Sequence, residues 1–339
     1  MTVYVDPACN INYGSFYIKG LWNLYGRKNV EFTSRYFKKL KYTTDSHCIA
    51  FVVAGKKYVI DFADSNRLFY DCFLEWADEY GKVNYFQEAI PQKWAHKVHR
   101  VGANFGIGCF GRNKYTATLK CLINFSKCFR RLKYGFKGFL SPYLWLYKRS
   151  RISWEPSVST VGSRKIFMVS RYWKGQPWVN NARIDFIRAC RRLQKEGEIE
   201  FIGGLIPDTK EHDCPDDVLL DSEIPLADYM KHLDESLLVF NTPAYHRCHG
   251  WKLPEYLAHG KIILSTPFVN ELPIPLEDRE NIFFTESNEG DIYKAIKEIV
   301  NNQALQKTLE EGSRKYWEEY GSPAACLKYF IYGKTTPLY

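Results

Sequence analysis

The sequence predicts an α/β protein made of two doubly wound, Rossmann-like domains that face each other across a cleft. Short apolar runs alternate with amphipathic segments along most of the 339 residues, a pattern typical of a parallel sheet covered by helices. A chain of this length can bury two separate cores. The segment "WEPSVSTVGSRK" (154–165) supplies Pro, Ser and Gly, so we place the domain boundary near residue 155.

The second half of the chain carries the clearer alternation. The expected strands are "KIFMVS" (165–170), "EIEFIGG" (198–204), "SLLVFN" (236–241), "KIILS" (261–265) and "NIFFT" (281–285). The expected helices are 179–197, 224–233, a short one that begins near Leu253-Pro254, and 288–300. Ile184, Ile187 and Leu193 form part of an apolar stripe in the first of these helices, and Gly197 closes it.

The first half also alternates, although less regularly. "TVYVD" (2–6) opens it as a strand, and "NINYGSFYIKG" (10–20) is expected to be a glycine loop that runs into a helix. "CIAFVVAG" (48–55) and "KKYVIDFAD" (56–64) are expected strands joined by a Gly-Lys turn. A helix is expected over 65–81, followed by strands at 82–87 and 97–102.

Several function classes are disfavoured by what the sequence lacks. The start "MTVYVDP" has neither the basic nor the apolar region of a signal peptide. The ten cysteines form no C-x-x-C pair, which favours reduced thiols in a cytoplasm. A Rossmann-type oxidoreductase is disfavoured because no G-x-G-x-x-G follows strand 2–6 or strand 165–170. His246, Cys248 and His249 lack the spacing of known zinc sites, so a loop or cleft lining is the favoured interpretation.

The positive charge is concentrated in one part of the chain. From Ala89 to Trp154 there are fourteen Lys or Arg and no Asp or Glu, while the whole chain carries +9, so the remainder is mildly acidic. Within this part, segment 112–151 interleaves the cations with aromatic and aliphatic residues. It is either a membrane-surface element, whose cations meet anionic headgroups, or a nucleic-acid surface, whose aromatics stack on bases. The membrane interpretation is favoured.

Two strand ends in the second half carry charged residues. Lys252 and Glu255 lie at the start of the helix near Pro254. An acid in a first helical turn contributes about 0.3–1 kcal/mol without any ligand, but a Lys there is unfavourable unless an anion binds. Arg171 and Lys174 follow strand 165–170 in "SRYWKGQPW". Together these cations favour a diphosphate between the two strand ends, and a solvated surface pair is the alternative.

Residues 165–320 resemble the donor-binding domain of GT-B glycosyltransferases of the bacterial group 1, family 4-like class. The motifs that carry the resemblance, in order, are "SRYWKG" (170–175), "WKLPEYLAHGKIILST" (251–266) and "ENIFFTESNEGDIYKAIKEIV" (280–300). The resemblance implies an acceptor-binding domain over 1–155, a nucleotide-sugar donor domain over 156–320, and a tail, 321–339, that crosses back to the first domain. The first half resembles an acceptor domain only in its α/β pattern.

The resemblance also implies roles for the charged residues. Glu255 would accept hydrogen bonds from the donor ribose, while Arg171 and Lys174 would hold the diphosphate and Lys252 would add charge. No metal would be needed, and no Asp-x-Asp is present that could hold one. One departure is Arg247, which stands eight positions before Glu255 where the family often has a second Glu.

Further site residues are expected in loops. Asn270 and Glu271, in "TPFVNELP" (266–273), would line the donor pocket. Asp61 and Asp64 are candidates for a general base, because they lie at the end of strand 56–64. The alternative for Asp64 is to cap a helix that begins near Ser65.

The loop at 10–20 is expected to place Gly14 and Ser15 against the acceptor or the sugar, and a simple turn at Gly14 is the alternative. The resulting hypothesis is a hexosyl- or related glycosyltransferase that moves a sugar from a UDP- or GDP-linked donor to a glycan or lipid-linked acceptor. It would act in surface polysaccharide or glycolipid synthesis, in the cytoplasm on the inner face of the cell membrane, without a nucleic-acid partner. The alternative is a basic nucleic-acid-binding α/β protein without transferase activity.

Overall fold

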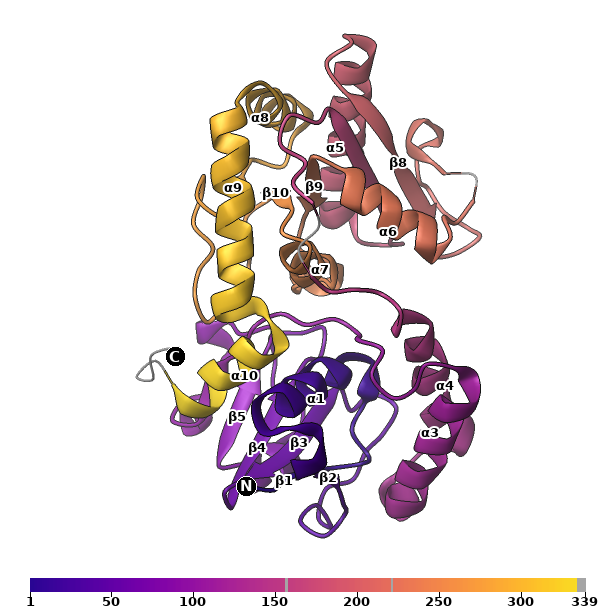
Figure 1. Ribbon diagram of the computed structural model, residues 1–339, viewed down its shortest axis with the longest axis vertical. Coiled ribbons are helices and arrows are strands. Elements are labelled where there is room, and N and C mark those ends of the chain that lie inside the picture. The colour runs from indigo at the N-terminus through magenta and orange to yellow at the C-terminus, as the bar shows by residue number, and fades with distance from the viewer. Residues whose placement is uncertain (156–157, 221, 334–339) are drawn as a thin grey trace. The chain divides into compact units, whose positions relative to one another are not determined.

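The computed structural model describes residues 1–155, 158–220 and 222–333. It divides into two compact units (Figure 1). The first unit comprises Met1–Ser153, Asn270–Ile274 and Glu319–Tyr339, and the second comprises Trp154–Val269 and Pro275–Glu318. Residues 156–157 of the expected boundary segment and 334–339 of the expected tail lie outside the described residues.

The first unit contains a six-stranded sheet in the order β2-β1-β3-β4-β5-β6. Its strands are β1 (Val3–Val5), β2 (Val30–Phe32), β3 (Cys48–Val53), β4 (Lys56–Asp61), β5 (Glu79–Lys82) and β6 (Val98–Arg100). The expected α/β class is confirmed, but this sheet is mixed, because β3 runs antiparallel to both β1 and β4. Ala54 and Gly55 join β3 to β4 with φ of 49° and 83°, and two consecutive positive φ values are the conformation of a tight hairpin turn.

Helix α1 (Ile11–Tyr25) replaces the loop that the sequence predicted at 10–20. The Asn10 side chain accepts a hydrogen bond from the N–H of Asn12 at 3.0 Å and so caps the helix. Gly20 lies where α1 approaches α10 (Pro323–Tyr332). A Cβ at Gly20 would lie 2.2 Å from the Pro323 carbonyl oxygen, so only glycine permits this contact.

The helix predicted at 65–81 is largely absent. Only α2 (Asp71–Trp76) forms, and β5 begins three residues later. The N–H of Asp78 donates to the Lys57 carbonyl at 2.9 Å, and β5 continues this pairing with β4. Tertiary pairing to the sheet therefore overrides the helical pattern of this segment.

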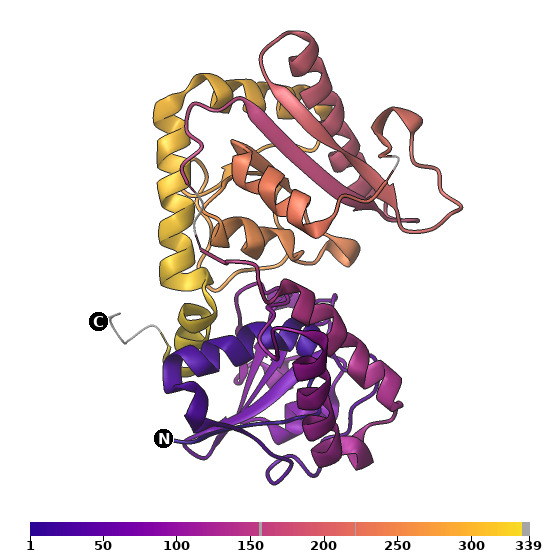
Figure 2. The ribbon, with the colours of Figure 1, turned by 45° about the vertical axis from the view of Figure 1, so that its right-hand side comes forward.

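The second unit contains only parallel strand pairs among its described residues. Its strands are β7 (Lys165–Tyr172), β8 (Glu200–Pro207), β9 (Leu238–Asn241), β10 (Ile262–Ser265) and β11 (Phe283–Phe284). The long strands β7 and β8 lie side by side in Figure 2. β7 also adjoins the start of β9, because the N–H of Leu237 donates to the Lys165 carbonyl at 2.7 Å. The predicted parallel α/β arrangement is confirmed here.

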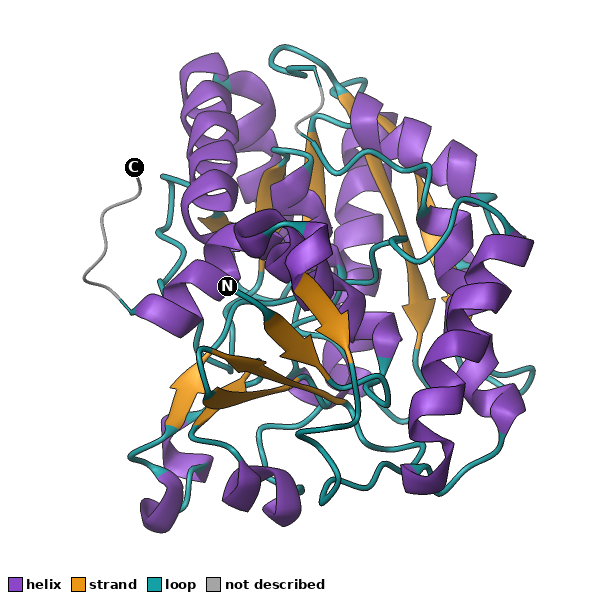
Figure 3. Cartoon of the chain, turned by 60° about the horizontal axis from the view of Figure 1, so that its bottom comes forward, coloured by secondary structure: helices purple, strands orange, loops and turns teal. Residues whose placement is uncertain are grey.

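The strands of the second unit form a three-stranded sheet, β11-β10-β9, and a two-stranded sheet, β7-β8. Helices pack against these strands (Figure 3). They are α5 (Pro177–Lys195), α6 (Leu226–Glu235), α7 (Lys252–Ala258), α8 (Glu289–Asn301) and α9 (Gln303–Tyr316). Ile166 and Met168 of β7 join the apolar cluster formed with α5 and α8. Phe167 points to the opposite face, since side chains alternate along a strand, and its ring contacts Tyr229 and His232 of α6. The second unit is therefore doubly wound.

The first unit also contains α3 (Lys114–Cys128) and α4 (Phe136–Leu146), which pack against each other. They form most of the basic segment 112–151. Each helix within the described residues is too short or too polar to span a bilayer.

Candidate functional site

The candidate site lies at the carboxyl ends of β7 and β9 in the second unit. β7 is followed by a turn at Gly175, with φ of 74°, and then by α5. β9 is followed by a ten-residue connection, residues 242–251, and then by α7. In open α/β sheets the carboxyl ends of the strands are where ligands bind. The site therefore takes its side chains from α5, α7 and the loops before them.

Lys252 is the first residue of α7 and reaches back into the unit. Its Nζ donates to the Val169 carbonyl at 2.8 Å and to the Tyr229 hydroxyl at 2.9 Å. The ammonium also lies 5.0 Å from the centre of the Tyr229 ring. Desolvation by burial lowers the pKa of Lys252 to about 8, although the charge of Glu255 opposes this. The lysine at the start of the helix therefore ties α7 to β7 and α6.

Arg183 of α5 is the second cation of the site, and sequence reasoning missed it. Arg183 is 5% exposed. Its Nη1 donates a hydrogen bond to the Arg171 carbonyl at the end of β7. Burial lowers the pKa of Arg183 to about 10. Its charge also contributes to the lowered pKa of Lys252, so the two cations lie close enough to repel each other. The sequence does contain a signal for this residue, because Arg183 lies within two turns of the start of a helix that follows a strand.

Glu255 is the carboxylate of this site. It is 6% exposed and lies in the first turn of α7. Its charge acts on both Lys252 and the neighbouring Tyr256, and burial raises the pKa of that tyrosine. Helix α7 begins about one residue before the predicted start. The buried Arg183 and Glu255 and the half-buried Lys252 thus form a group with an excess of positive charge, hereafter the α5–α7 site, and such a group is suited to an anion.

Arg171 and Lys174 lie outside the α5–α7 site. Both are exposed at the end of β7 and in the following turn. The Arg171 guanidinium pairs with Glu223, and the Lys174 Nζ lies 4.0 Å from Glu211. Arg183 thus contacts the backbone carbonyl of Arg171, while the Arg171 side chain pairs with Glu223. Exposed pairs of this kind contribute roughly 0–1 kcal/mol and open readily.

The connection before α7 has an unusual backbone. His246 and Arg247 have φ of 52° and 62°, in the left-handed region that non-glycine residues rarely adopt. The Arg247 guanidinium lies 4.5 Å from the centre of the Trp178 ring. The Cys248 thiol donates to the Tyr245 carbonyl at 2.7 Å. Across the described residues, no group of three His, Cys, Asp or Glu side chains is placed to bind a metal ion.

Asn270 and Glu271 belong to the first unit, and not to the unit that holds Lys252. Asn270 Nδ2 lies 3.3 Å from Asn84 Oδ1. Glu271 forms an ion pair with Arg100, and its N–H donates to the Tyr85 carbonyl at 2.8 Å. A short antiparallel bridge to Tyr85 thus attaches the two residues to the first unit. The expectation of a loop at 266–273 does not include this bridge.

The candidate bases differ in accessibility. Asp61 is completely buried, and it accepts hydrogen bonds from Lys82 at 3.0 Å and from the Tyr80 hydroxyl at 2.8 Å. A carboxylate enclosed in this way stabilises the sheet and is closed to an acceptor. Asp64 is exposed. The expected helix start at Ser65 is wrong, because that segment forms a bend, so Asp64 caps no helix there.

Gly14 and Ser15 lie inside α1 and are buried. A Cβ at Gly14 would lie 3.8 Å from the Ile49 Cβ, an ordinary packing distance. The Ser15 hydroxyl accepts a hydrogen bond from the N–H of Ile107 at 3.0 Å. Both positions therefore contribute to packing of the first unit, and the expected loop at these positions is wrong, because they lie in a helix.

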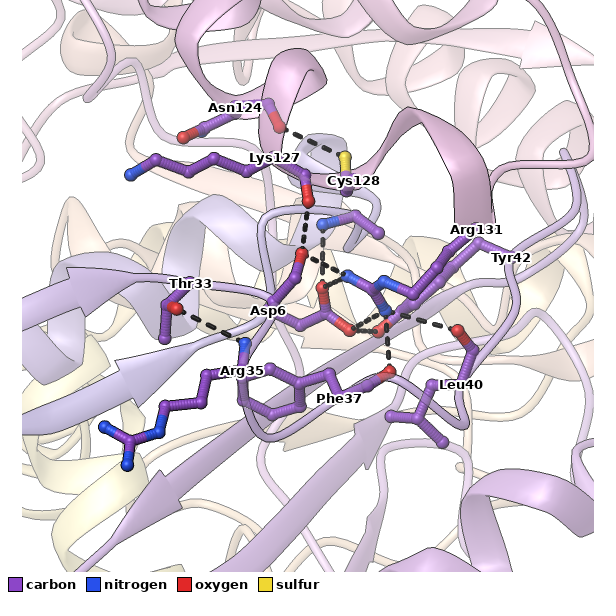
Figure 4. Close-up of polar contacts among 12 residues, drawn as sticks. Asp6, Thr33, Arg35, Phe37, Leu40, Tyr42, Asn124, Lys127, Cys128 and Arg131 are labelled. Atoms are coloured by element: carbon purple, nitrogen blue, oxygen red, sulfur yellow. Dashed lines mark hydrogen bonds and ion pairs between the residues drawn. The ribbon is translucent and has the colours of Figure 1, made fainter.

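The basic segment is anchored to the first unit by a buried ion pair (Figure 4). Arg131 donates to Asp6 at 2.8 Å and also to the carbonyls of Phe37 and Leu40. The Tyr42 hydroxyl donates to the same carboxylate at 3.1 Å. Burial raises the pKa of Asp6, and the bonds from Arg131 oppose this rise.

Neither a protein-family model nor a curated protein matches the chain. Similar solved structures include the C-terminal domain of a group 1 family glycosyl transferase from Francisella tularensis (12% identity, 50% of this chain and 96% of that chain, TM-score 0.37). Others are S. aureus MnaA with UDP (14%, 79% and 73%, 0.40) and sucrose-phosphate synthase from Thermosynechococcus elongatus (14%, 76% and 57%, 0.40).

Proposed function

We propose that the chain is a glycosyltransferase that moves a sugar from a nucleotide-sugar donor to a glycan or lipid-linked acceptor. The observation that supports this is the α5–α7 site. Arg183 and Lys252 are both desolvated there and donate to carbonyl and hydroxyl groups, so a diphosphate would supply the negative charge that they lack. Glu255 beside them would accept hydrogen bonds from the ribose of the same donor.

The chemistry of sugar transfer explains why such cations are useful. As the bond between the sugar and the diphosphate breaks, the departing nucleoside diphosphate gains negative charge. Cations that are already fixed in a water-poor site stabilise this charge without reorganisation. The lowered pKa of Lys252 (about 8) would rise when a diphosphate binds. These residues would supply the charge without a metal ion.

The two units would bind different substrates. The second unit would bind the donor, and the first unit would bind the acceptor, with Asp64 as the candidate base that remains accessible. Arg171 and Lys174 would exchange Glu223 and Glu211 for the diphosphate. We propose a hexosyl donor and a role in surface polysaccharide or glycolipid synthesis at the inner face of the cell membrane. UDP, which is named in the MnaA structure, is the first ligand to test, and GDP is the second.

Thermal unfolding tests the proposal with UDP, GDP, CMP and NAD in turn. A ligand present at about a hundred times its Kd stabilises a protein by about 2.7 kcal/mol, which shifts the Tm of a chain of this size by a few degrees. We expect one nucleoside diphosphate to give such a shift in the wild type and in the control Glu311→Ala, which removes an exposed carboxylate of α9. Glu255→Ala should remove it. If no nucleotide shifts the Tm of the folded wild type, the proposed function is wrong.

A further inference from the structure

Helix α3 carries apolar side chains on the face that points away from the core. Ala117, Cys121, Asn124 and Cys128 are its buried residues. Large apolar side chains elsewhere on α3 are exposed: Tyr115 by 85%, Leu119 by 59%, Leu122 by 48% and Ile123 by 40%. These four recur at the spacing of a single helix face. Helix α3 therefore has a second apolar face that the fold does not use.

Cations border this outer face. Lys114 and Lys120 lie on α3 beside the apolar residues and are exposed. The segment from Ala89 to Trp154 contains no acid that could neutralise them. We name the four exposed apolar residues with these two lysines the α3 face. An apolar stripe bordered by lysines is the pattern of a helix that lies in the plane of a membrane interface.

The α3 face is held firmly by the first unit. The Asn113 and Thr116 side chains cap the start of the helix in a capping box. Near its end, the Lys127 Nζ donates to the Phe32 carbonyl at 2.8 Å, and Arg131 follows with its buried ion pair to Asp6. In Figure 1, α3 and α4 lie together at the periphery of this unit. The apolar residues are thus presented by an anchored helix and not by a loose loop.

We propose that the α3 face docks the protein on an anionic lipid bilayer. The aliphatic and aromatic side chains would enter the interface between headgroups and acyl chains, while the lysines would contact anionic headgroups. This deepens the proposed function, and rests on it for its role, because the contact would bring the first unit to a lipid-linked acceptor.

Other occupants fit the α3 face less well. A second copy of the chain would bring another acid-free cationic surface against this one, and like charges repel. Single-stranded nucleic acid binds through aromatic rings that stack on bases. Leu119, Leu122 and Ile123 cannot stack in this way, so most of the exposed apolar surface would not contribute to nucleic-acid binding. An anionic bilayer can bury the aliphatic side chains and also attract the lysines.

The test is flotation of the full chain with phosphatidylcholine vesicles that either contain or lack phosphatidylglycerol. We expect the wild type to bind the anionic vesicles, and added salt to weaken this binding. The triple variant Leu119→Ser, Leu122→Ser, Ile123→Ser should bind at least about tenfold more weakly. The control Phe69→Ser removes another exposed side chain of the first unit, 57% exposed, and should bind like the wild type. Lys114→Glu with Lys120→Glu provides a second variant should the triple variant not fold.

Three results would overturn the inference. One is a folded wild type that ignores anionic vesicles, and another is equal binding by the wild type and both α3 variants. The third is a wild type that dimerises or binds single-stranded DNA through this face while leaving vesicles alone, as light scattering and DNA titration would show. Nucleotide-induced thermal shifts on the same proteins keep the two proposals separate. A folded wild type that binds anionic vesicles but shows no nucleotide shift contradicts the proposed function alone, and one that shows the shift but does not bind vesicles contradicts the inference alone.

Discussion

Two buried cations of the first unit, Lys82 and Arg131, lie against carboxylates, whereas Arg183 and the half-buried Lys252 of the second unit lie against carbonyl and hydroxyl groups. Lys82 pairs with Asp61 at 3.0 Å, and both side chains are fully buried. Arg131 pairs in the same way with Asp6. Arg183 instead donates to a backbone carbonyl. Lys252 is bonded to a carbonyl and a hydroxyl.

The pKa directions show what this difference means. Burial alone would lower the pKa of Arg131, but the hydrogen bond and charge of Asp6 raise it above its ordinary value. The pKa of Arg183 is lowered to about 10 and that of Lys252 to about 8, chiefly by desolvation. Lys82 and Arg131 are therefore neutralised within the first unit, whereas Arg183 and Lys252 donate hydrogen bonds to uncharged groups. Self-paired cations serve folding, and the others are suited to binding.

The largest expected effect is on folding of the first unit. Lys82→Met leaves the Asp61 carboxylate buried without its cation, which typically costs about 3–5 kcal/mol. Urea denaturation should show this loss, and adding Asp61→Leu should recover much of it, because an apolar pair of similar volume is tolerated. A loss below about 1 kcal/mol would show that the pair is not a closed structural unit.

The pH dependence of UDP binding should be the next largest effect. The Lys252 ammonium is present below pH 8 and is lost as the pH rises through its pKa of about 8. UDP affinity should therefore fall by up to about tenfold per pH unit above pH 8. Fluorescence or calorimetric titrations of the wild type and of Lys252→Met would measure this. A wild-type profile as flat as that of the variant would remove Lys252 from the site.

Without ligand, Lys252 should have the opposite effect on stability. Its pKa is depressed in the folded state, so the unfolded chain binds more protons between about pH 8 and pH 10. The free energy of unfolding contributed by this group should therefore rise with pH across that window. Denaturant titrations of the wild type and Lys252→Met at several pH values would show it as a difference in slope, and identical slopes would contradict the lowered pKa.

The exposed cations should give the smallest effect. Arg171→Ala breaks an exposed ion pair with Glu223, so the free energy of unfolding should change by less than about 1 kcal/mol. Its UDP affinity should fall only about threefold, because an exposed cation is screened by water and salt. Urea denaturation and UDP titration would measure the two changes. If Arg171→Ala loses as much UDP affinity as a substitution of the buried Arg183, the ligand instead binds chiefly at the end of β7.

Much of the second unit could be predicted from the sequence because its signals are local. Strands β7 and β9 and helix α8 each follow an apolar or amphipathic run that needs no distant partner to be recognised. In the first unit, the pairing of β5 with β4 replaced a predicted helix, and this pairing joins segments about twenty residues apart. Such long-range contacts leave no mark on local periodicity.

The candidate site was predictable only in part, for a similar reason. Lys252 and Glu255 stood out because their charges lie next to a strand–helix junction. Asp61 also lay at a strand end, but its partner Lys82 comes from a neighbouring strand and closes it. Arg183 looked like an ordinary polar position of an amphipathic helix, and only the fold shows that it is buried.

The most direct test of the central claim is calorimetric titration of UDP into the wild type, Arg183→Met and Arg188→Met. Arg188 lies on the same helix, but its side chain is 40% exposed and pairs with Asp217 at 2.8 Å, so it is the matched control. We predict that UDP binds the wild type and Arg188→Met with similar affinity, and that Arg183→Met binds at least about tenfold more weakly, or about 1.4 kcal/mol, while remaining folded. Equal affinity in all three proteins, or no binding to the folded wild type, would contradict a nucleoside diphosphate site at the α5–α7 site.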